Sequence, residues 1–204
     1  GVALAQRRIV TDQANLLDAV AEIGTPCVVK PVDACHYLFD RKAIILREAD
    51  EAAAALPYWP AEHASLCVQR FVDGPRHDIS FAAHRGRLIG AVDCKVLQTD
   101  RQDGTGYTTR LVSTRPHPEV ARGVEAIVRA LNYTGVGDIE FMVDERSGDV
   151  SLIELNPRLS ASFKSAEVCG LPVSRLMLQL GLGMAPPEVA DPWAYPVGRR
   201  TVWT

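Results

Sequence analysis

The chain has 204 residues, of which 47% are hydrophobic and 23% are charged, and its formal net charge is −3 at pH 7. This length and apolar content suffice for one large domain or two small lobes with a buried core, and they argue against a disordered chain. The slightly acidic balance argues against a general nucleic-acid binder, which is usually basic. An anionic ligand would need local cations or a metal ion, because the overall charge does not attract it.

Cysteine usage and hydropathy predict a cytoplasmic protein. The five cysteines are odd in number and form no CxxC pair, and Cys27, Cys67 and Cys94 lie in apolar runs. This pattern is typical of buried free thiols in a reducing compartment. No apolar run reaches the length of a membrane span, and the first residues lack the features of a signal peptide. The chain starts without Met, so we expect a fragment or a processed product.

The first third of the chain predicts a small lobe of alternating helices and strands. Apolar residues recur at helical spacing before Gly24, which ends the first helix. A second, Ala-rich helix stops at Pro57. The expected elements are helices at Asn15–Ile23 and Glu48–Leu56, and strands at Pro26–Val32, Ala43–Leu46 and Leu66–Val72.

The remainder predicts a second lobe with an antiparallel sheet. Two apolar runs flank Arg85-Gly86-Arg87, which is a hairpin signal. Residues 98–109 are polar and contain glycine, so a loop is expected there. The expected elements are strands at Ile79–Ala83, Leu88–Val92, Val136–Val143 and Val150–Leu155, and helices at Pro118–Leu131 and Val173–Leu182.

These elements predict an α+β chain in three segments. Residues 1–68 are expected to form the small lobe, residues 69–184 the larger lobe, and residues 185–204 an irregular tail. The hinge between the lobes is expected near Gln69–Gly74, where an apolar strand gives way to a Gly-Pro corner.

Oxygen-donor side chains recur on the two last expected strands. Because side chains alternate between the faces of a hairpin, Glu140, Glu154 and Asn156 should lie on one face. These donors include no His or Cys, a composition that suits Mg²⁺ or Mn²⁺. Arg158 follows closely and could hold a phosphate or a carboxylate.

The alternative to a metal site is a solvated polar face on an ordinary hairpin. The run Ser151–Leu155 is mostly apolar, so we expect this strand to be buried. A buried carboxylate needs a partner, and a metal ion is one. Asp138 on the preceding strand could support that site or cap the end of its strand.

These segments resemble a known family. The run VSLIELNPRLSAS, from Val150 to Ser162, resembles the metal-binding strand of ATP-grasp enzymes, especially the carbamoyl-phosphate synthetase and biotin carboxylase branch. The run GVGDIEF before it resembles the preceding strand, with Glu140 at the first ligand position. The runs GTPCVVKP and QRFVDGPRH, in that order upstream, resemble the strand with the phosphate-binding lysine and the segment between the lobes.

The resemblance implies an ATP-grasp fold of two α/β lobes with a nucleotide cleft between them. It also assigns roles to individual residues. Lys30 could instead be an edge lysine with its amine in water, His77 a surface histidine, and Lys95 a solvated lysine. The implied metal ligands are Glu140, Glu154 and Asn156, the implied catalytic cations are Lys30 and Arg158, and the implied nucleotide contacts are Lys30, Gln69, Arg70, Phe71, Val72, His77 and Lys95.

The chain departs from the family pattern in two places. The family has a glycine-rich loop after the lysine strand, whereas Asp33–Lys42 contains no glycine. The loop could use the side chains of His36, Arg41 and Lys42, or it could be degenerate or incomplete. The family also has an N-terminal domain before these lobes, which this chain lacks in our reading. The tail residues Trp193 and Trp203 could dock on that domain or on a homodimer partner.

The function implied by the resemblance is a ligase that forms ADP and phosphate. ATP would activate a small carboxylate as an acyl phosphate, which an amine (or a thiol) attacks, with no nucleic-acid or membrane partner. Residues 98–109 would bind the acceptor, and Ser160 and Ser162 are interpreted as loop and helix-cap residues. One alternative is a bicarbonate-activating carboxylase or carbamoyl-phosphate-type enzyme. Another is a nucleotide-binding module without turnover.

Overall fold

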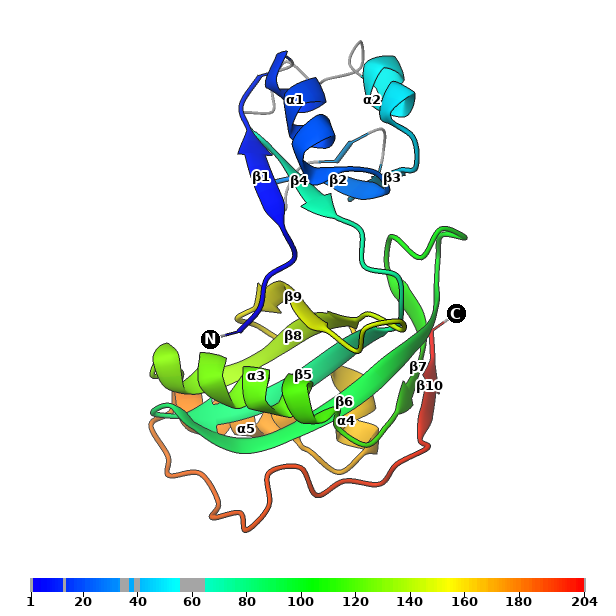
Figure 1. Cartoon of the computed structure of the whole chain (residues 1–204). Helices are drawn as coiled ribbons and strands as arrows, with labels where there is room; N and C mark the ends of the chain where they lie inside the picture. The colour runs from blue at the N-terminus through cyan, green and yellow to red at the C-terminus, as the bar shows by residue number, and fades with distance from the viewer. Residues whose placement is uncertain (1, 13, 34–36, 39–40, 56–64, 204) are drawn as a thin grey trace. The chain divides into compact units, whose positions relative to one another are not determined.

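The computed structural model describes the chain except for residues 1, 13, 34–36, 39–40, 56–64 and 204 (Figure 1). Contacts divide the chain into two compact units. The small unit comprises Leu4–Val72 together with Thr99–Tyr107. The large unit comprises Asp73–Gln98 and Thr108–Thr204 together with the first three residues. Among the described residues, no helix is long and apolar enough to cross a membrane.

The small unit is a four-stranded antiparallel sheet with both of its helices on one face (Figure 1). Leu16 and Val20 on the first helix pack against Val29 and Val68 in the sheet. The sheet order is β1-β4-β2-β3. The elements are β1 (Arg7–Val10), α1 (Ala14–Ile23), β2 (Cys27–Pro31), β3 (Ile44–Leu46), α2 (Ala49–Ala55) and β4 (Leu66–Arg70).

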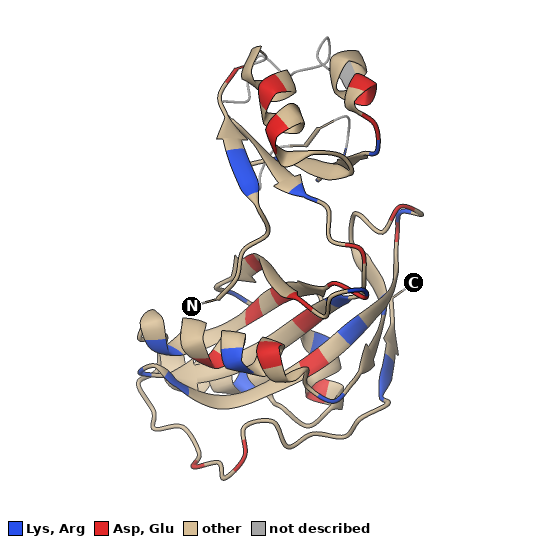
Figure 2. Cartoon of the chain, viewed as in Figure 1, with Lys and Arg blue, Asp and Glu red and all other residues tan. Residues whose placement is uncertain are grey.

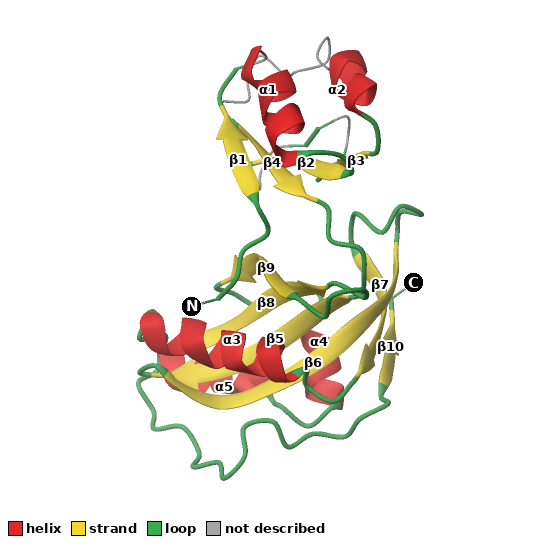
Figure 3. Cartoon of the chain, in the orientation of Figure 1, coloured by secondary structure: helices red, strands yellow, loops and turns green. Residues whose placement is uncertain are grey.

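The large unit is a six-stranded sheet with helices on both faces (Figure 3). Its strand order is β10-β7-β6-β5-β8-β9. Its strands are β5 (Arg76–His84), β6 (Arg87–Thr99), β7 (Thr108–Ser113), β8 (Gly135–Val143), β9 (Val150–Asn156) and β10 (Arg200–Val202). Its helices are α3 (Pro118–Ala130), α4 (Phe163–Val168) and α5 (Val173–Gly181).

Alternation along the central strands gives the sheet two different faces. Phe81 on β5 and Phe141 on β8 are fully buried against the apolar side of α3. On the other face, Ala82 and Val92 pack under α4 and α5. We call these the α3 face and the α4/α5 face. A residue's position along its strand therefore decides which of two separate cores it enters.

Most long elements match the sequence-based expectations, whereas four short elements were missed. The helices expected at Asn15–Ile23, Glu48–Leu56, Pro118–Leu131 and Val173–Leu182 are present with small shifts at their ends. The missed elements are β1, β7, α4 and β10. They are short, and β1 buries only its last residue, so no apolar period marks it. The tail expected to be irregular thus contains β10.

Two further expectations concern the central hairpin and the cysteines. The hairpin is longer than expected, because β5 and β6 continue through the polar residues on both sides of the apolar runs. Cys27, Cys67, Cys94 and Cys169 are buried free thiols, as expected. Cys35 lies outside the described residues.

Gly137 on β8 provides a test of the packing on the α3 face. A methyl group there would lie 2.7 Å from the Phe81 ring and 3.0 Å from the carbonyl oxygen of Asn156. We expect Gly137→Ala to lower the free energy of unfolding by about 1–3 kcal/mol, because the packed ring must move. The matched control is Gly181→Ala at the end of α5, where a methyl group meets nothing within 4 Å. Urea unfolding measures both, and a Gly137→Ala protein as stable as the control would contradict this packing.

Candidate functional site

A row of polar side chains crosses the α4/α5 face of the large unit at β5, β8 and β9. Asp78 on β5 lies opposite Glu140 on β8, and Ser80 lies opposite Asp138. Figure 2 shows the acidic segments on these neighbouring strands. The residues that alternate with them, such as Ile139, are buried on the α3 face. The strand period therefore gathers the acids on one side of the sheet.

The three expected metal ligands lie on this same face. Glu140 pairs with Glu154 across the β8–β9 ladder, and Asp138 pairs with Asn156. The register shifts next to Glu140, at a bulge before Phe141. Opposed pairs in such a ladder have neighbouring side chains, so these carboxylates and the amide are adjacent.

The expectation that β9 is buried was wrong. Every β9 residue is half-buried except Glu154, which is exposed. The apolar run here lies on the outermost strand of the sheet, which has a neighbour on one side only. Exposure then falls inward along the row, to 5% for Asp78 and 1% for Asp138. The outer ligand Glu154 is thus open to solvent, while the inner acids are buried.

Hydroxyl groups provide the hydrogen bonds of the inner acids. The Ser80 hydroxyl donates to Asp138 Oδ2 at 3.0 Å. The Ser162 hydroxyl lies 3.2 Å from Asp78 Oδ1 and 3.5 Å from Asp138 Oδ2. Ser162 is the N-cap residue of α4, as expected, but its side chain makes no cap hydrogen bond. Its side chain instead faces the acids.

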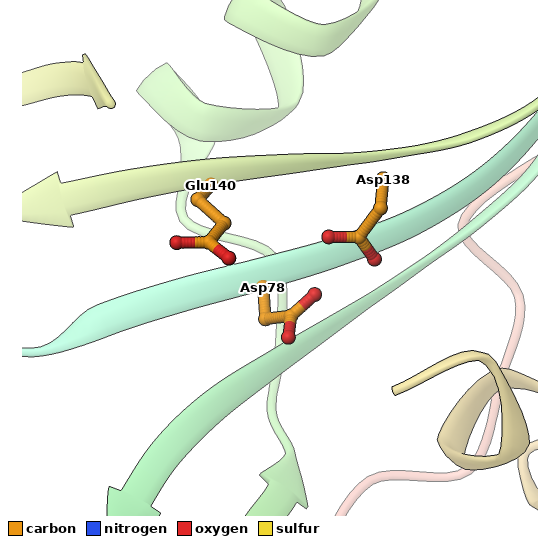
Figure 4. A group of neighbouring side chains, drawn as sticks. All are labelled: Asp78, Asp138 and Glu140. Atoms are coloured by element: carbon orange, nitrogen blue, oxygen red, sulfur yellow. The ribbon is translucent and has the colours of Figure 1, made fainter. Parts of the chain in front are cut away.

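Asp78, Asp138 and Glu140 converge, as Figure 4 shows. One carboxylate oxygen from each lies within 4.8 Å of the others. Burial, followed by the neighbouring carboxylates of Asp138 and Glu140, raises the pKa of Asp78 well above its ordinary value of 3.8. In the absence of a cation, the Asp78 carboxyl therefore holds its proton more tightly than a solvated aspartate does.

Arg76 is the basic residue that pairs with this face. Its Nη1 lies 3.7 Å from Glu140 Oε2, and its Nη2 donates to Thr108 Oγ1 at 2.5 Å. The Arg76 and Glu140 side chains are each 18% exposed, so solvent only partly screens the pair. Arg158, the cation expected beside the metal ligands, is exposed, and its Nη1 donates to the carbonyl oxygen of Leu159 at 3.0 Å.

His77 and Lys95 lie on the α3 face, away from the metal ligands. They pair with each other across β5 and β6. His77 Nδ1 lies 2.8 Å from Asp93 Oδ1, and Asp93 is fully buried. The backbone N–H of His117 also approaches Asp93 Oδ2 at 3.4 Å. The structure therefore brings His77 to Asp93 and not to Glu140.

The small unit carries the remaining expected nucleotide contacts. Lys30 on β2 pairs with Cys67, and Gln69 on β4 pairs with Val28. These residues alternate with the core residues Val29 and Val68, so they point away from α1 and α2. Gln69 is nevertheless 6% exposed, and Lys30 is half-buried.

The segment after Gln69 has one amide left for a ligand. The Arg70 N–H donates to Gln6 and the Phe71 N–H to Pro26, at 2.8 Å and 3.2 Å. The Val72 N–H donates to no group within the described part of the chain. An adenine edge could therefore accept a bond from Val72, as the family resemblance implies.

Within the small unit, the loop Thr99–Tyr107 contacts the segment that lacks glycine. Arg41 Nη1 pairs with Asp103 Oδ2 at 3.1 Å, and Lys42 Nζ lies 4.4 Å from the centre of the Tyr107 ring. The Tyr37 and Tyr107 hydroxyls are 3.3 Å apart. Two of the cations suggested for the phosphate-binding loop thus already have partners, whereas His36 lies outside the described residues.

The outer row, which comprises Glu140, Glu154 and Asn156, fits a magnesium ion. Glu140, Glu154 and Asn156 offer carboxylate and amide oxygens, the donors that Mg²⁺ prefers. Exposure of Glu154 leaves room for water or phosphate oxygens to complete the coordination. The donor set contains no sulfur or imidazole that would favour zinc.

Sequence reasoning missed three residues of this region. Asp78, Arg76 and Asp93 were not singled out, although Arg76-His77-Asp78-Ile79-Ser80 alternates charged or polar residues on one side of β5. That alternation is visible in the sequence and could have predicted that Arg76 and Asp78 share a face. The pairing of β5 with β8 could not be predicted in this way, because it joins residues more than fifty positions apart.

Comparison with known proteins shows the family of the chain. A family described as "Carbamoyl-phosphate synthase L chain, ATP binding domain" matches residues 2–189. The carbamoyl phosphate synthase large chain of Mycobacterium tuberculosis is 26% identical over 196 residues, which cover 92% of this chain and 17% of that protein. The chain thus spans about a sixth of the length of that relative.

Solved structures share the fold at low identity. Biotin carboxylase from Campylobacter jejuni, solved as a β,γ-ATP complex, has a TM-score of 0.71 and 20% identity, covering 98% of this chain and 46% of its own. An L-amino acid ligase from Bacillus licheniformis has a TM-score of 0.66 and 18% identity, covering 88% of this chain and 43% of its own. At such identities the likeness concerns the fold.

The raised pKa of Asp78 predicts a pH dependence of stability. Folding favours the protonated form of Asp78 because the pKa of this carboxyl is higher in the folded state. The stability that protonated Asp78 contributes to the folded state is therefore full below pH 3.8 and is lost as the pH rises through the pKa of the folded state. Asp78→Asn stays neutral and avoids this loss. With chelator present, we expect the variant to gain stability over the wild type as the pH rises, by up to about 1.4 kcal/mol per pH unit. Urea unfolding between pH 4 and 8 measures this difference in stability. The control is Asp18→Asn, because Asp18 is an exposed residue of α1. Parallel curves for Asp78→Asn and the wild type would contradict the assignment.

Proposed function

The chain belongs to the family of carbamoyl-phosphate synthase L chain ATP-binding domains and has the ATP-grasp fold, and we propose that it binds Mg-ATP and uses it to phosphorylate a small carboxylate. The observation that carries this proposal is the row of oxygen donors formed by the Glu140–Glu154 and Asp138–Asn156 pairs. That row supports a magnesium site, and the family to which the chain belongs is described as an ATP-binding domain.

Glu140, Glu154 and Asn156 are the proposed ligands of the ion, and Mn²⁺ suits the same donors. When bound, the ion neutralises negative charge on the transferred phosphoryl group. Lys30 and Arg158 are proposed to add positive charge around the phosphates. Arg158 is exposed, and its one hydrogen bond within the described residues is to the neighbouring carbonyl of Leu159, so it can turn to a ligand at little cost.

The nucleotide contacts are proposed from the segment Gln69–Val72; His77 and Lys95 are left out of this proposal because they lie on the opposite face of the sheet from the metal ligands. The unpaired Val72 N–H supports an adenine contact.

The proposed reaction proceeds in two steps. A carboxylate oxygen attacks the γ-phosphorus, the bond to the β–γ bridging oxygen breaks, and ADP leaves an acyl phosphate behind. An amine or thiol then attacks the acyl carbon, phosphate departs, and the nucleophile loses a proton. Such a reaction needs positioning and charge stabilisation more than a protein nucleophile.

A second candidate is that bicarbonate is the phosphorylated acid. The family match and the M. tuberculosis carbamoyl phosphate synthase large chain favour it. Because the chain spans only part of such relatives, its partner could be a further domain or a second copy. The buried free thiols support a reducing, cytoplasmic location.

A panel of acids and amines separates these activities. Phosphate release from Mg-ATP is measured with each acid alone and with each acid–amine pair. Release that needs both an acid and an amine identifies a carboxylate–amine ligase, and release with bicarbonate alone identifies the second candidate. Tight Mg-ATP binding without release under any condition would reject turnover and leave a nucleotide-binding module.

Glu154→Ala tests the metal row directly. We expect Mg²⁺-dependent ATP binding, measured by calorimetry, to be lost, because the variant removes the most exposed carboxylate of the row. Glu145→Ala in the exposed turn of the same hairpin should bind as the wild type does. A folded Glu154→Ala protein with unchanged affinity and phosphate release would refute the assignment.

A further inference from the structure

The inner acids of the large unit form a group behind the proposed magnesium ligands. Asp78 and Asp138 are 5% and 1% exposed, whereas Glu154 is exposed. They converge with Glu140, and one oxygen from each lies within 4.8 Å of the others (Figure 4). The outer ligands Glu154 and Asn156 lie on β9, on the far side of β8 from Asp78.

One oxygen of this group lacks any partner. Asp138 Oδ1 is buried and accepts no hydrogen bond within the described residues, although Oδ2 of the same side chain has hydroxyl partners. A buried carboxylate oxygen has lost its water, and no N–H or hydroxyl group of the described chain replaces it at Oδ1; the neighbouring carboxyl group in hydrogen-bond contact with Asp138 is that of Asp78. A buried oxygen of this kind, in a group of three converging carboxyl groups, is suited to a cation.

The two buried aspartates of the group have no basic partner among the described residues. Arg76 approaches Glu140 at 3.7 Å, but neither Asp78 nor Asp138 has an ion-pair partner in the described part of the chain. Their other neighbours, Ser80 and Ser162, are neutral hydroxyls. Three ionised carboxylates this close would repel one another strongly, and a bound cation would offset that repulsion.

We infer that Asp78, Asp138 and Glu140, with the Ser162 hydroxyl, form an inner site for one hard divalent cation. Two oxygens on opposite sides of a calcium-sized ion lie about 4.8 Å apart, and Mg²⁺ or Mn²⁺ would draw them closer. Glu140 stands between this inner site and the outer row, so an ion in the inner site would fix the position of a carboxylate that the outer ion also uses. Cation uptake at the inner site requires neither ATP nor turnover.

Manganese binding to the chelator-treated, nucleotide-free chain tests this site. Free Mn²⁺ is measured by electron paramagnetic resonance in the wild type, Glu154→Gln and Asp138→Asn. We expect Glu154→Gln, which weakens the outer row, to retain one Mn²⁺ per chain, and Asp138→Asn to weaken that binding by more than about tenfold. Asp78→Asn should weaken it as well, and it serves if Asp138→Asn does not fold.

Thermal unfolding supplies a second measurement. Without metal, Asp138→Asn should unfold at the temperature of the wild type or higher, because the amide removes charge repulsion. Added Mn²⁺ should raise the unfolding temperature of the wild type and Glu154→Gln by more than that of Asp138→Asn, which keeps only the outer ligands.

Three results would overturn the inner site. They are no Mn²⁺ uptake by the wild type at millimolar concentration, equal uptake by Asp138→Asn, or loss of uptake in Glu154→Gln with retention in Asp138→Asn. Since no nucleotide is present, these results are independent of whether the phosphate-release panel finds an activity.

Discussion

Side-chain alternation along β5, β8 and β9 is the constraint on which the large unit depends. It sends Phe81, Ile139 and Phe141 into the core beneath α3 and, in the same strands, sends Asp78, Asp138 and Glu140 to the opposite face. The two sets cannot be separated, because a shift of one residue in register would exchange them. The apolar core therefore fixes the positions of the acids, and it does so without direct contact with any ligand.

The acidic row changes in character from its edge to its interior. Glu154 is exposed and can exchange water for a ligand. Asp138 is buried; its Oδ2 accepts a hydrogen bond from the Ser80 hydroxyl, while its Oδ1 has no hydrogen-bond partner among the described residues. Arg76 pairs with Glu140, between these extremes, and also bonds to Thr108 on β7. One guanidinium thus joins the acidic row to the strand that follows the polar loop.

Much of the fold and part of the site were predictable from the sequence. The α3 helix and the β8–β9 hairpin have strong periods, and the alternation in the hairpin correctly placed Glu140, Glu154 and Asn156 on one face. The burial of β9 was not predictable, because an apolar run does not reveal that its strand lies at the edge of a sheet. Asp78 was missed for a related reason, since its place beside Glu140 follows from pairing between distant strands. For the same reason, the sequence could not show that His77 faces Asp93 on the other side of the sheet.

The loop Thr99–Tyr107 connects β6 to β7 of the large unit, yet its contacts assign it to the small unit. The chain therefore passes between the units after Ala3, Val72, Gln98 and Tyr107. Recombination at a single point near Val72 would not exchange the small unit intact, because Asp103 and Tyr107 would stay behind while Arg41 and Lys42 departed. Homologous small units can be exchanged as modules only if both segments travel together, so the loop and the segment that it contacts are expected to evolve as one piece.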